Sequence, residues 1–329
     1  MRAVRAGAGG GRRGGEGPYP GAWMRILITG VTGFVGAALA RRLEGEGHDL
    51  HGLARDPRGV DPRLGVAVHA GDALTGAGLA EALDGAEVAY YLIHSMEPAS
   101  EAGSFAGREL RSAERFAAAA AAAGVRRIVY LGGLVPTGGG PISAHLRSRL
   151  AVEGILVGAV PDSVALRASI IVGARSRSFR FLVRLVERLP VLALPSWRDH
   201  RTQPLDERDM LEYLALAATG PVGGRTLDLA GRDTLSYGAM IEQVAEAMLV
   251  RRPAVRLGFA LTPVTSVVAA RIAGEELALA GPLMESLATD LLADDTAARA
   301  LLGVRLHGYR AAVEHALREW EEREPLRAR

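Results

Sequence analysis

The first half of the chain alternates short apolar runs with segments in which apolar residues recur every three to four positions. The runs have the length and uninterrupted character of strands buried on both faces, and the segments between them have the period of helices that pack on a sheet. The alternation predicts an α/β fold, a doubly wound parallel sheet with helices on both faces. The predicted strands are 26–28, 50–54, 66–70, 88–93, 128–131 and 164–168, and the predicted helices are 37–44, 79–83, 105–123 and 143–154.

The second half alternates less regularly. A further apolar run at 170–173 follows the sixth strand, and the run at 226–230 is predicted to be a last strand of the main sheet. Helical spacing predicts helices at 179–189, 208–218 and 236–250, and residues 251–329 are expected to be mostly helical. We therefore expect a smaller, mostly helical C-terminal lobe beside the sheet.

A glycine-rich segment links the first predicted strand to the first helix. Gly30, Gly33 and Gly36 have the spacing G-x-x-G-x-x-G directly after the apolar run. We expect Gly30 to permit the turn, Gly33 to let a phosphate approach the backbone, and Gly36 to let the helix pack tightly on the strand. The free N–H groups and the positive dipole end of the helix would then bind a pyrophosphate.

Other residues with suitable chemistry follow the ends of predicted strands, namely Arg55, Asp72, His94, Gly132 and Gly173. Ligands of doubly wound sheets bind at the carboxyl ends of the strands, near the switch in strand order, so this agreement supports a ligand site at the glycine turn. The pattern is that of a Rossmann-type fold. The expected division is a disordered Gly/Arg-rich tail at 1–23, a Rossmann domain at 24–173 to which 202–231 returns, and a substrate-side lobe at 174–201 and 232–329.

The composition excludes several kinds of chemistry. The chain has no cysteine, so a disulfide, a thiolate nucleophile and a cysteine zinc site are excluded, and a reducing cytoplasm is the expected compartment. It also has no lysine, and all 39 of its Lys+Arg residues are arginine, which excludes a Schiff base and a P-loop lysine. The adjacent carboxylates Asp294 and Asp295 are interpreted as a solvated face or helix cap, and no metal site is expected.

The charge and hydropathy narrow the choice of partners. Residues 1–23 hold four arginines and one glutamate, so the tail accounts for more than the whole net charge of +2, and the folded part is close to neutral. We therefore expect no nucleic-acid partner. No apolar segment reaches the roughly 20 residues of a membrane-spanning helix, so no membrane span is expected. The sequence does not decide the oligomeric state, and a homodimer is one option.

Several segments together resemble a known family. Residues 29–36 match the T-G-x-x-G-x-x-G turn of the extended and atypical short-chain dehydrogenase/reductases. The set resembles the NAD(P)-binding YbjT-like branch, which is related to NmrA-like proteins and to NAD-dependent epimerases/dehydratases, over about residues 24–295. The resemblance continues through residues 54–57, 71–72, 91–96, 128–134, 143–149, 166–173 and 203–205.

The resemblance implies a dinucleotide cofactor, and charge bears on its identity. A carboxylate after the second strand would repel a 2′-phosphate, whereas this chain has Arg55 there, so NADP(H) is favoured, with NAD(H) as the alternative because Asp56 follows. Arg55 could instead be a solvated surface arginine, and Asp72, which resembles the family's adenine-contacting aspartate, could cap a turn. The expected cofactor contacts are Gly30, Thr32, Gly33, Phe34, Val35, Gly36, Arg55, Asp72, Ala73, His94, Ser95, Leu131, Gly132 and Arg149.

The catalytic positions depart from the family. Ordinary members use Tyr-x-x-x-Lys on the helix after the fifth strand, and the matching positions here hold His145 and Arg149, which share one helix face. The resemblance gives Arg149 the ribose-binding role and His145 the proton-donor role, and the guanidinium would keep the imidazole mostly neutral at pH 7 by lowering its pKa. The pair could instead only pack or bind cofactor. His94 is a second catalytic candidate, or a loop histidine that holds the backbone.

These observations lead to two hypotheses. The leading one is an NAD(P)-dependent oxidoreductase that transfers hydride to or from a small, largely apolar carbonyl or alcohol, or an epimerase or dehydratase that uses transient oxidation. The substrate itself is not determined. The alternative is a redox sensor or assembly factor that binds NADP(H) without turnover, which the absence of the Tyr-x-x-x-Lys pair favours.

Overall fold

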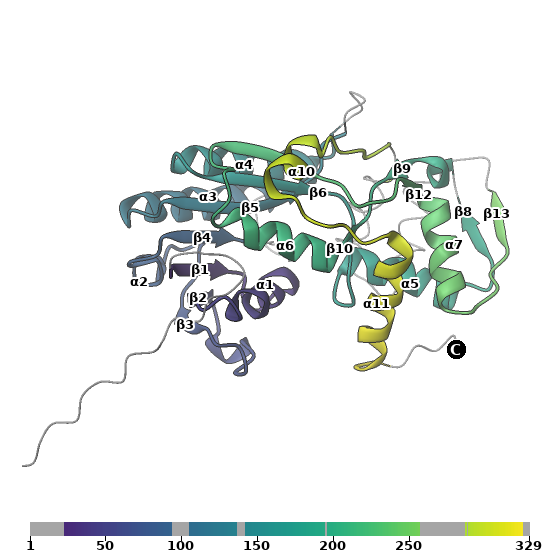
Figure 1. Cartoon of the computed structure of the whole chain (residues 1–329), viewed down its shortest axis with the longest axis horizontal. Helices are drawn as coiled ribbons and strands as arrows, with labels where there is room; N and C mark the ends of the chain where they lie inside the picture. The colour runs from purple at the N-terminus through teal and green to yellow at the C-terminus, as the bar shows by residue number, and fades with distance from the viewer. Residues whose placement is uncertain are drawn as a thin grey trace, which may run out of the picture.

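The computed structural model describes residues 23–93, 105–136, 142–194, 196–256, 287 and 289–324. Its centre is a seven-stranded sheet in which every pairing is parallel, in the order β11-β6-β5-β4-β1-β2-β3 (Figure 1). The predicted sheet is therefore confirmed, including the return of the chain to its edge. The strands are β1 Arg25–Thr29, β2 Asp49–Ala54, β3 Ala67–Ala70, β4 Val88–Tyr91, β5 Arg127–Gly133, β6 Val164–Ala168 and β11 Arg225–Leu229.

Helices cover both faces of the sheet, as the alternation predicts. On one face α1 (Phe34–Glu44), α6 (Glu207–Ala217) and α10 (Thr296–Leu302) share a hydrophobic core with the strands. On the other face α2 (Leu79–Leu83), α3 (Phe105–Ala122) and α4 (Ala144–Ala159) enclose a second core. Figure 1 shows the strands stacked from β6 near the top to β3 near the bottom, with α2 and α3 at the left and α1 and α6 to the right of β1 and β4.

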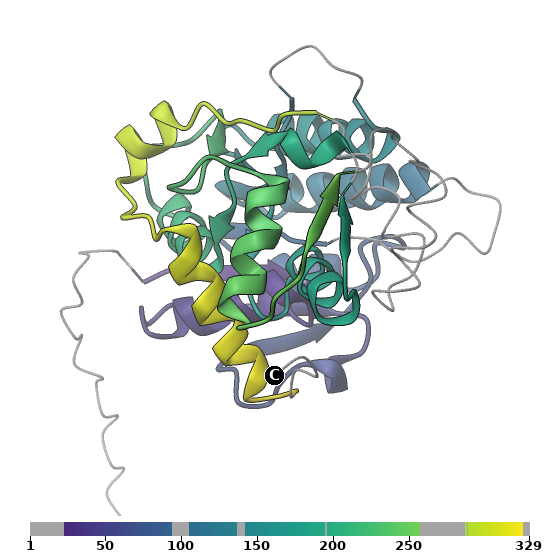
Figure 2. The same ribbon diagram turned by 90° about the vertical axis from the view of Figure 1, so that its right-hand side faces the viewer.

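A third hydrophobic core lies beyond the carboxyl ends of the strands. It is formed by α5 (Arg177–Arg188), α7 (Tyr237–Ala247) and α11 (Tyr309–Glu321), with contributions from β8 (Leu192–Leu194). Strand β13 (Ala254–Arg256) pairs with β8, and Figure 2 shows this pair beside α7, which lies between the pair and α11. Helix α11 is held to α5 because the guanidinium groups of Arg180 and Arg184 lie 4.3 and 4.9 Å from the ring centroid of Trp320.

Three details differ from the sequence expectations or were left open by them. The run at 170–173 does not extend the main sheet; β7 (Ile171–Val172) pairs with β10 (Leu205–Asp206) instead, because the chain turns out of the sheet after Ala168. Helix α4 continues past Gly154, since burying Leu156 against the sheet outweighs the roughly 1 kcal/mol that a glycine costs a helix. The region after 251 contains a strand, β13, as well as helices.

Several expectations stay open. The predicted disordered tail lies almost entirely outside the described residues, and the proposed domain division stays a prediction.

Two further short strands, β9 (Arg201–Thr202) and β12 (Leu235–Ser236), form an antiparallel pair. The 3₁₀ helices are η1 (Pro57–Gly59) and η2 (Ser196–Asp199). Within the part of the chain that the structure describes, no helix is long and apolar enough to cross a membrane.

The strand order sets the position of the ligand site. Strands β1 and β4 are neighbours at the centre of the sheet, and the chain reaches β4 only after it has built the β2–β3 side. Thr29 joins their ends: its hydroxyl donates to the carbonyl of Tyr90 at 2.9 Å and accepts from the N–H of Leu92 at 3.0 Å. This is the switch in strand order beside which doubly wound sheets bind their ligands.

Candidate functional site

The glycine turn lies at the switch between β1 and β4. Gly30 adopts a φ of +67°, and the Gly33 N–H donates to the Gly30 carbonyl at 2.8 Å, which closes the turn. Gly33 is the N-cap of α1, no side chain caps the helix, and its first turn contains no acidic residue. The first N–H groups of α1 are therefore available to an anion, as the sequence predicts.

The three glycines of the turn differ in what a side chain at each position would contact. A Cβ on Gly30 would lie 2.6 Å from the Leu92 carbonyl oxygen, and a Cβ on Gly36 would overlap the Gly30 carbonyl. A Cβ on Gly33 would meet only the Gly30 oxygen, at 3.1 Å, and Gly33 is exposed. Gly30 and Gly36 are thus required by the protein itself, whereas the space in front of Gly33 is open to a ligand.

A hollow of about 390 Å³ lies at the carboxyl ends of β2 and β3. Its lining includes Arg55 and Asp72, which the sequence assigns to the adenosine side of the cofactor. The Asp72 carboxylate accepts from the N–H of Leu74 at 2.8 Å, so the turn-capping role that the sequence left open is present. The same residue also faces the hollow, so the two roles are compatible.

The segment after β2 brings a second arginine near the turn. Asp56 caps η1, and its carboxylate accepts two hydrogen bonds from the Arg58 side chain at 2.9 and 3.0 Å. Gly59, the last residue of η1, lies close enough to the glycine turn that a Cβ on it would be 3.6 Å from the Thr32 methyl group. The segment after β2 therefore packs against the glycine turn at Thr32, and the charge of Arg58 is paired with Asp56.

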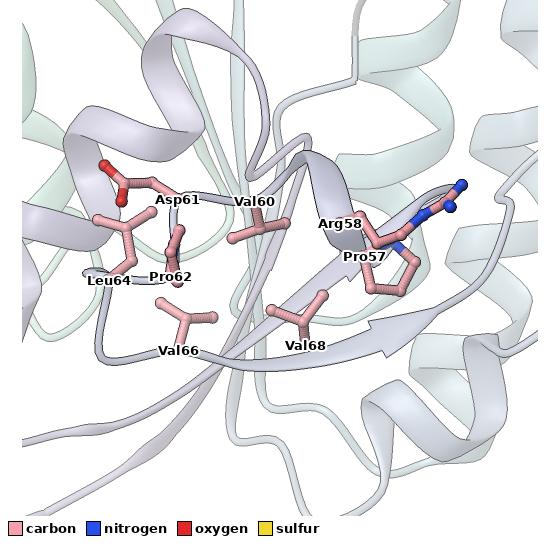
Figure 3. A pocket seen from close by; sticks show the side chains of 8 residues that line it. All are labelled: Pro57, Arg58, Val60, Asp61, Pro62, Leu64, Val66 and Val68. Carbon is pink, nitrogen blue, oxygen red and sulfur yellow. The ribbon is translucent and has the colours of Figure 1, made fainter.

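A second, apolar hollow of about 280 Å³ lies beside η1 and β3. Figure 3 shows the valine side chains of Val60, Val66 and Val68 converging on it, while the Arg58 guanidinium extends away. None of the predicted site residues lines this hollow. It has no role in the site proposed from the sequence.

The structure brings His145 and Arg149 together near the carboxyl end of β5. Both lie on α4, which begins after the Ser143 N-cap. Burial, and then the nearby charge of Arg149, lower the pKa of His145 to about 4. The sequence predicted the direction of this shift from Arg149 alone, and the burial of the imidazole makes it larger. His145 is neutral at pH 7.

Arg149 is buried and firmly held. Its guanidinium donates to the Leu131 carbonyl at 2.8 Å and lies 5.3 Å from the centroid of the Tyr130 ring. The neighbouring Ser148 hydroxyl donates to the Glu109 carboxylate at 2.6 Å, and burial raises the pKa of Glu109. The guanidinium thus lies near the carboxyl end of β5 and packs on the sheet, and its ribose contact stays a prediction.

Sequence reasoning missed a half-buried carboxyl group, Glu207, at the first position of α6. A Cβ placed on Gly173 would overlap the Glu207 carboxyl oxygen and would lie 3.0 Å from the tip of the Phe34 ring. Phe34 is the first residue of α1, so the Glu207 carboxyl lies near the tip of a side chain that belongs to the start of this helix. Burial raises the pKa of Glu207 to about 7. The sequence shows only a polar residue at a helix start, which carries no signal for this position.

The remaining predicted contacts are distributed as follows. His94 and Ser95 lie outside the described residues. Ala73 and Leu131 are buried. A Cβ placed on Gly132 would lie 3.0 Å from the Tyr130 ring, so this position has no room for a side chain. These three can offer only their backbones to a ligand. In the described ranges no group of three or more His, Asp or Glu side chains could hold a metal ion.

Comparison with known proteins relates this geometry to a family. Residues 26–146 match the model of the NAD dependent epimerase/dehydratase family. A search of curated proteins finds no match to the chain. Among solved structures, that of gox2253 is 23% identical, with a TM-score of 0.72 over 91% of this chain and 98% of that one.

Two further solved structures contain nucleotides. The Bordetella bronchiseptica enzyme WbmG, in complex with NAD and UDP, is 17% identical, with a TM-score of 0.71 over 93% of this chain and 97% of that one. The UDP-glucuronic acid 4-epimerase from Bacillus cereus, in complex with NAD, is 14% identical, with a TM-score of 0.70 over 91% of this chain and 99% of that one. At these identities the likeness establishes the fold.

The sheet order and the glycine turn define a Rossmann-type α/β protein. Residues 26–146 carry the sequence features of the NAD dependent epimerase/dehydratase family. Over the whole chain the fold is similar to that of a short-chain dehydrogenase/reductase superfamily protein from Agrobacterium tumefaciens, which is 19% identical, with a TM-score of 0.65 over 91% of this chain and 98% of that one. The predicted resemblance to NAD-dependent epimerases/dehydratases is confirmed over residues 26–146. The narrower YbjT-like branch stays a prediction.

Proposed function

We propose that this protein binds NAD(P)(H) on the glycine turn and acts as an oxidoreductase of the epimerase/dehydratase type on a small carbonyl or alcohol. The observation that carries the proposal is the uncapped N-terminus of α1, which opens onto the switch between β1 and β4. The neighbours WbmG and UDP-glucuronic acid 4-epimerase contain NAD, which supports a dinucleotide as the ligand.

The residues of the site fit such a cofactor. The free N–H groups of α1 and the open space before Gly33 suit a pyrophosphate, and the hollow lined by Arg55 and Asp72 suits an adenosine. A nicotinamide bound at the other end would supply or accept hydride. Arg149 would hold its ribose from the end of β5, and His145, on the same face of α4, would orient a substrate oxygen by a hydrogen bond.

His145 has limited power as an acid. Because its pKa lies at about 4, the imidazole at pH 7 can donate its N–H to an oxygen but holds no dissociable extra proton to transfer. This favours slow turnover, or none. The second candidate function is therefore a dinucleotide-binding sensor or assembly factor, which rests on the same glycine turn.

One pair of experiments tests the proposal. Mass spectrometry of gently purified protein is expected to detect a retained dinucleotide. Single-turnover oxidation of bound NADPH is then followed across a panel of aldehydes and ketones, with His145→Ala as the comparison. Oxidation that slows in His145→Ala supports the enzyme, whereas binding without oxidation of any compound supports the sensor. A protein that binds neither NADH nor NADPH contradicts both.

The preference for NADP(H) rests on Arg55. We expect Arg55→Ala to weaken NADPH binding about tenfold and NADH binding less than about twofold, because a guanidinium–phosphate contact is lost only with NADPH. Arg63→Ala is the matched control, since Arg63 is exposed, belongs to the same segment and bonds to Asp61. Fluorescence titration with both nucleotides measures the ratio. Equal losses for the two nucleotides in Arg55→Ala would remove the argument for NADP(H).

A further inference from the structure

Among the described residues, Glu207 is an acidic side chain close to the Phe34 ring at the start of α1. Its carboxyl oxygen and the tip of the Phe34 ring converge on the same point beside the Cα of Gly173. Phe34 is the first residue of α1, and its own N–H belongs to the free helix end that would bind phosphate. The carboxyl group therefore lies near the tip of a side chain whose own backbone N–H belongs to the proposed phosphate site.

The surroundings of Glu207 leave its charge poorly compensated. Glu319 lies on α11 and Arg323 just beyond its end, and Arg175 lies in the segment between β7 and α5. Asp206, the last residue of β10 and the N-cap of α6, directly precedes Glu207. The two carboxylates oppose ionisation of Glu207 and the two arginines favour it. The loss of solvent around the carboxyl, which also raises its pKa, is larger than each of these four effects. Among the described residues, none donates a hydrogen bond to the Glu207 carboxylate.

We propose that Glu207 couples dinucleotide binding to the uptake of a proton: the pyrophosphate binds at the glycine turn when the Glu207 carboxyl is neutral, and is repelled when it is charged. The inference rests on the proposed function, since it requires a dinucleotide at the turn. It makes Glu207 the group through which pH sets cofactor affinity.

The direction follows from electrostatics. Since burial already brings the Glu207 pKa to about 7, half of the molecules carry the neutral acid near neutral pH. Two phosphate charges several ångströms away favour the neutral form further, by about one pKa unit in a medium of intermediate dielectric constant. By linkage, affinity should fall about tenfold as the pH rises from about 6 to about 9.

Calorimetry measures the proton directly. NADH is the probe, because its pyrophosphate does not titrate in this range. At about pH 7.5, titrations in buffers of different ionisation enthalpy should show uptake of about half a proton per NADH bound. Glu207→Gln should bind NADH without that uptake and with an affinity that varies less than about twofold over the same range.

Glu212→Gln is the matched control, because it removes a carboxylate from the same helix that pairs with Arg42, away from the turn. It should keep the uptake and the pH dependence of the unaltered protein. Binding without proton uptake, or uptake that persists in Glu207→Gln, overturns this inference alone. Absence of NADH and NADPH binding in the unaltered protein overturns the proposed function, and this inference with it.

Discussion

Replacement of Gly33 by tryptophan is expected to reduce dinucleotide affinity at least about 100-fold while leaving the fold intact. The N-cap glycine is exposed and has a φ of −80° that any residue can adopt, and a Cβ there would meet only the Gly30 carbonyl oxygen, at 3.1 Å, which a shift of a few tenths of an ångström relieves. An indole at this position would fill the volume in front of the free N–H groups of α1. Fluorescence titration with NADPH and NADH measures the loss, and far-UV circular dichroism with thermal melting checks the fold.

Gly45→Trp provides the matched control. Gly45 ends the same helix, and a Cβ there meets nothing within 4 Å, so the same side chain is added at the opposite end of α1. This variant should bind as the unaltered protein does. Dinucleotide binding that survives Gly33→Trp would show that the ligand does not lie on the glycine turn.

Glu207→Gln is expected to stabilise the protein at alkaline pH. The pKa of the carboxyl is raised from 4.5 to about 7 on folding, so the folded protein binds more protons than the unfolded chain between these values. Stability contributed by the neutral acid is therefore complete below about pH 4.5 and is lost as the pH rises to about 7. The amide has no charge to desolvate, so the variant should gain about 2 to 3 kcal/mol at about pH 8 and little near pH 4.

Chemical denaturation at several pH values tests this expectation. The difference between the free energies of unfolding of Glu207→Gln and the unaltered protein should grow with pH and level off above about pH 8. Glu212→Gln, which loses an ion pair with Arg42, should not stabilise the protein at any pH. A constant difference for Glu207→Gln would mean that the carboxyl does not titrate near neutrality in the folded protein.

The strands and the turn were predictable because their signals are local. The run Ile26–Ile28 is apolar throughout, and a strand buried on both faces requires that pattern whatever surrounds it. Gly30 has a positive φ, and Gly36 has the Gly30 carbonyl against its Cα. Both requirements arise within a few residues of the chain. Spacing alone therefore identified the glycine turn.

The run at 170–173 shows the limit of such reasoning. Ile171 and Val172 are as apolar as residues of the main strands, but they pair with β10 outside the sheet. Pairing depends on where the chain turns, and here Ser169 donates to the Gln203 carbonyl at 2.9 Å from across the fold. A local pattern does not contain that contact.

By itself, the sequence determined the parallel α/β architecture, the glycine turn and the absence of a Tyr–Lys pair, because each depends on residue type and short spacing. Only the tertiary structure decided the electrostatics of the site. Burial lowers the pKa of His145 to about 4, and the packing of residues as distant as Phe34, Gly173 and Glu319 around Glu207 raises its pKa to about 7. Desolvation depends on neighbours that come together only when the chain folds, so the group best placed to respond to pH was not visible in the sequence.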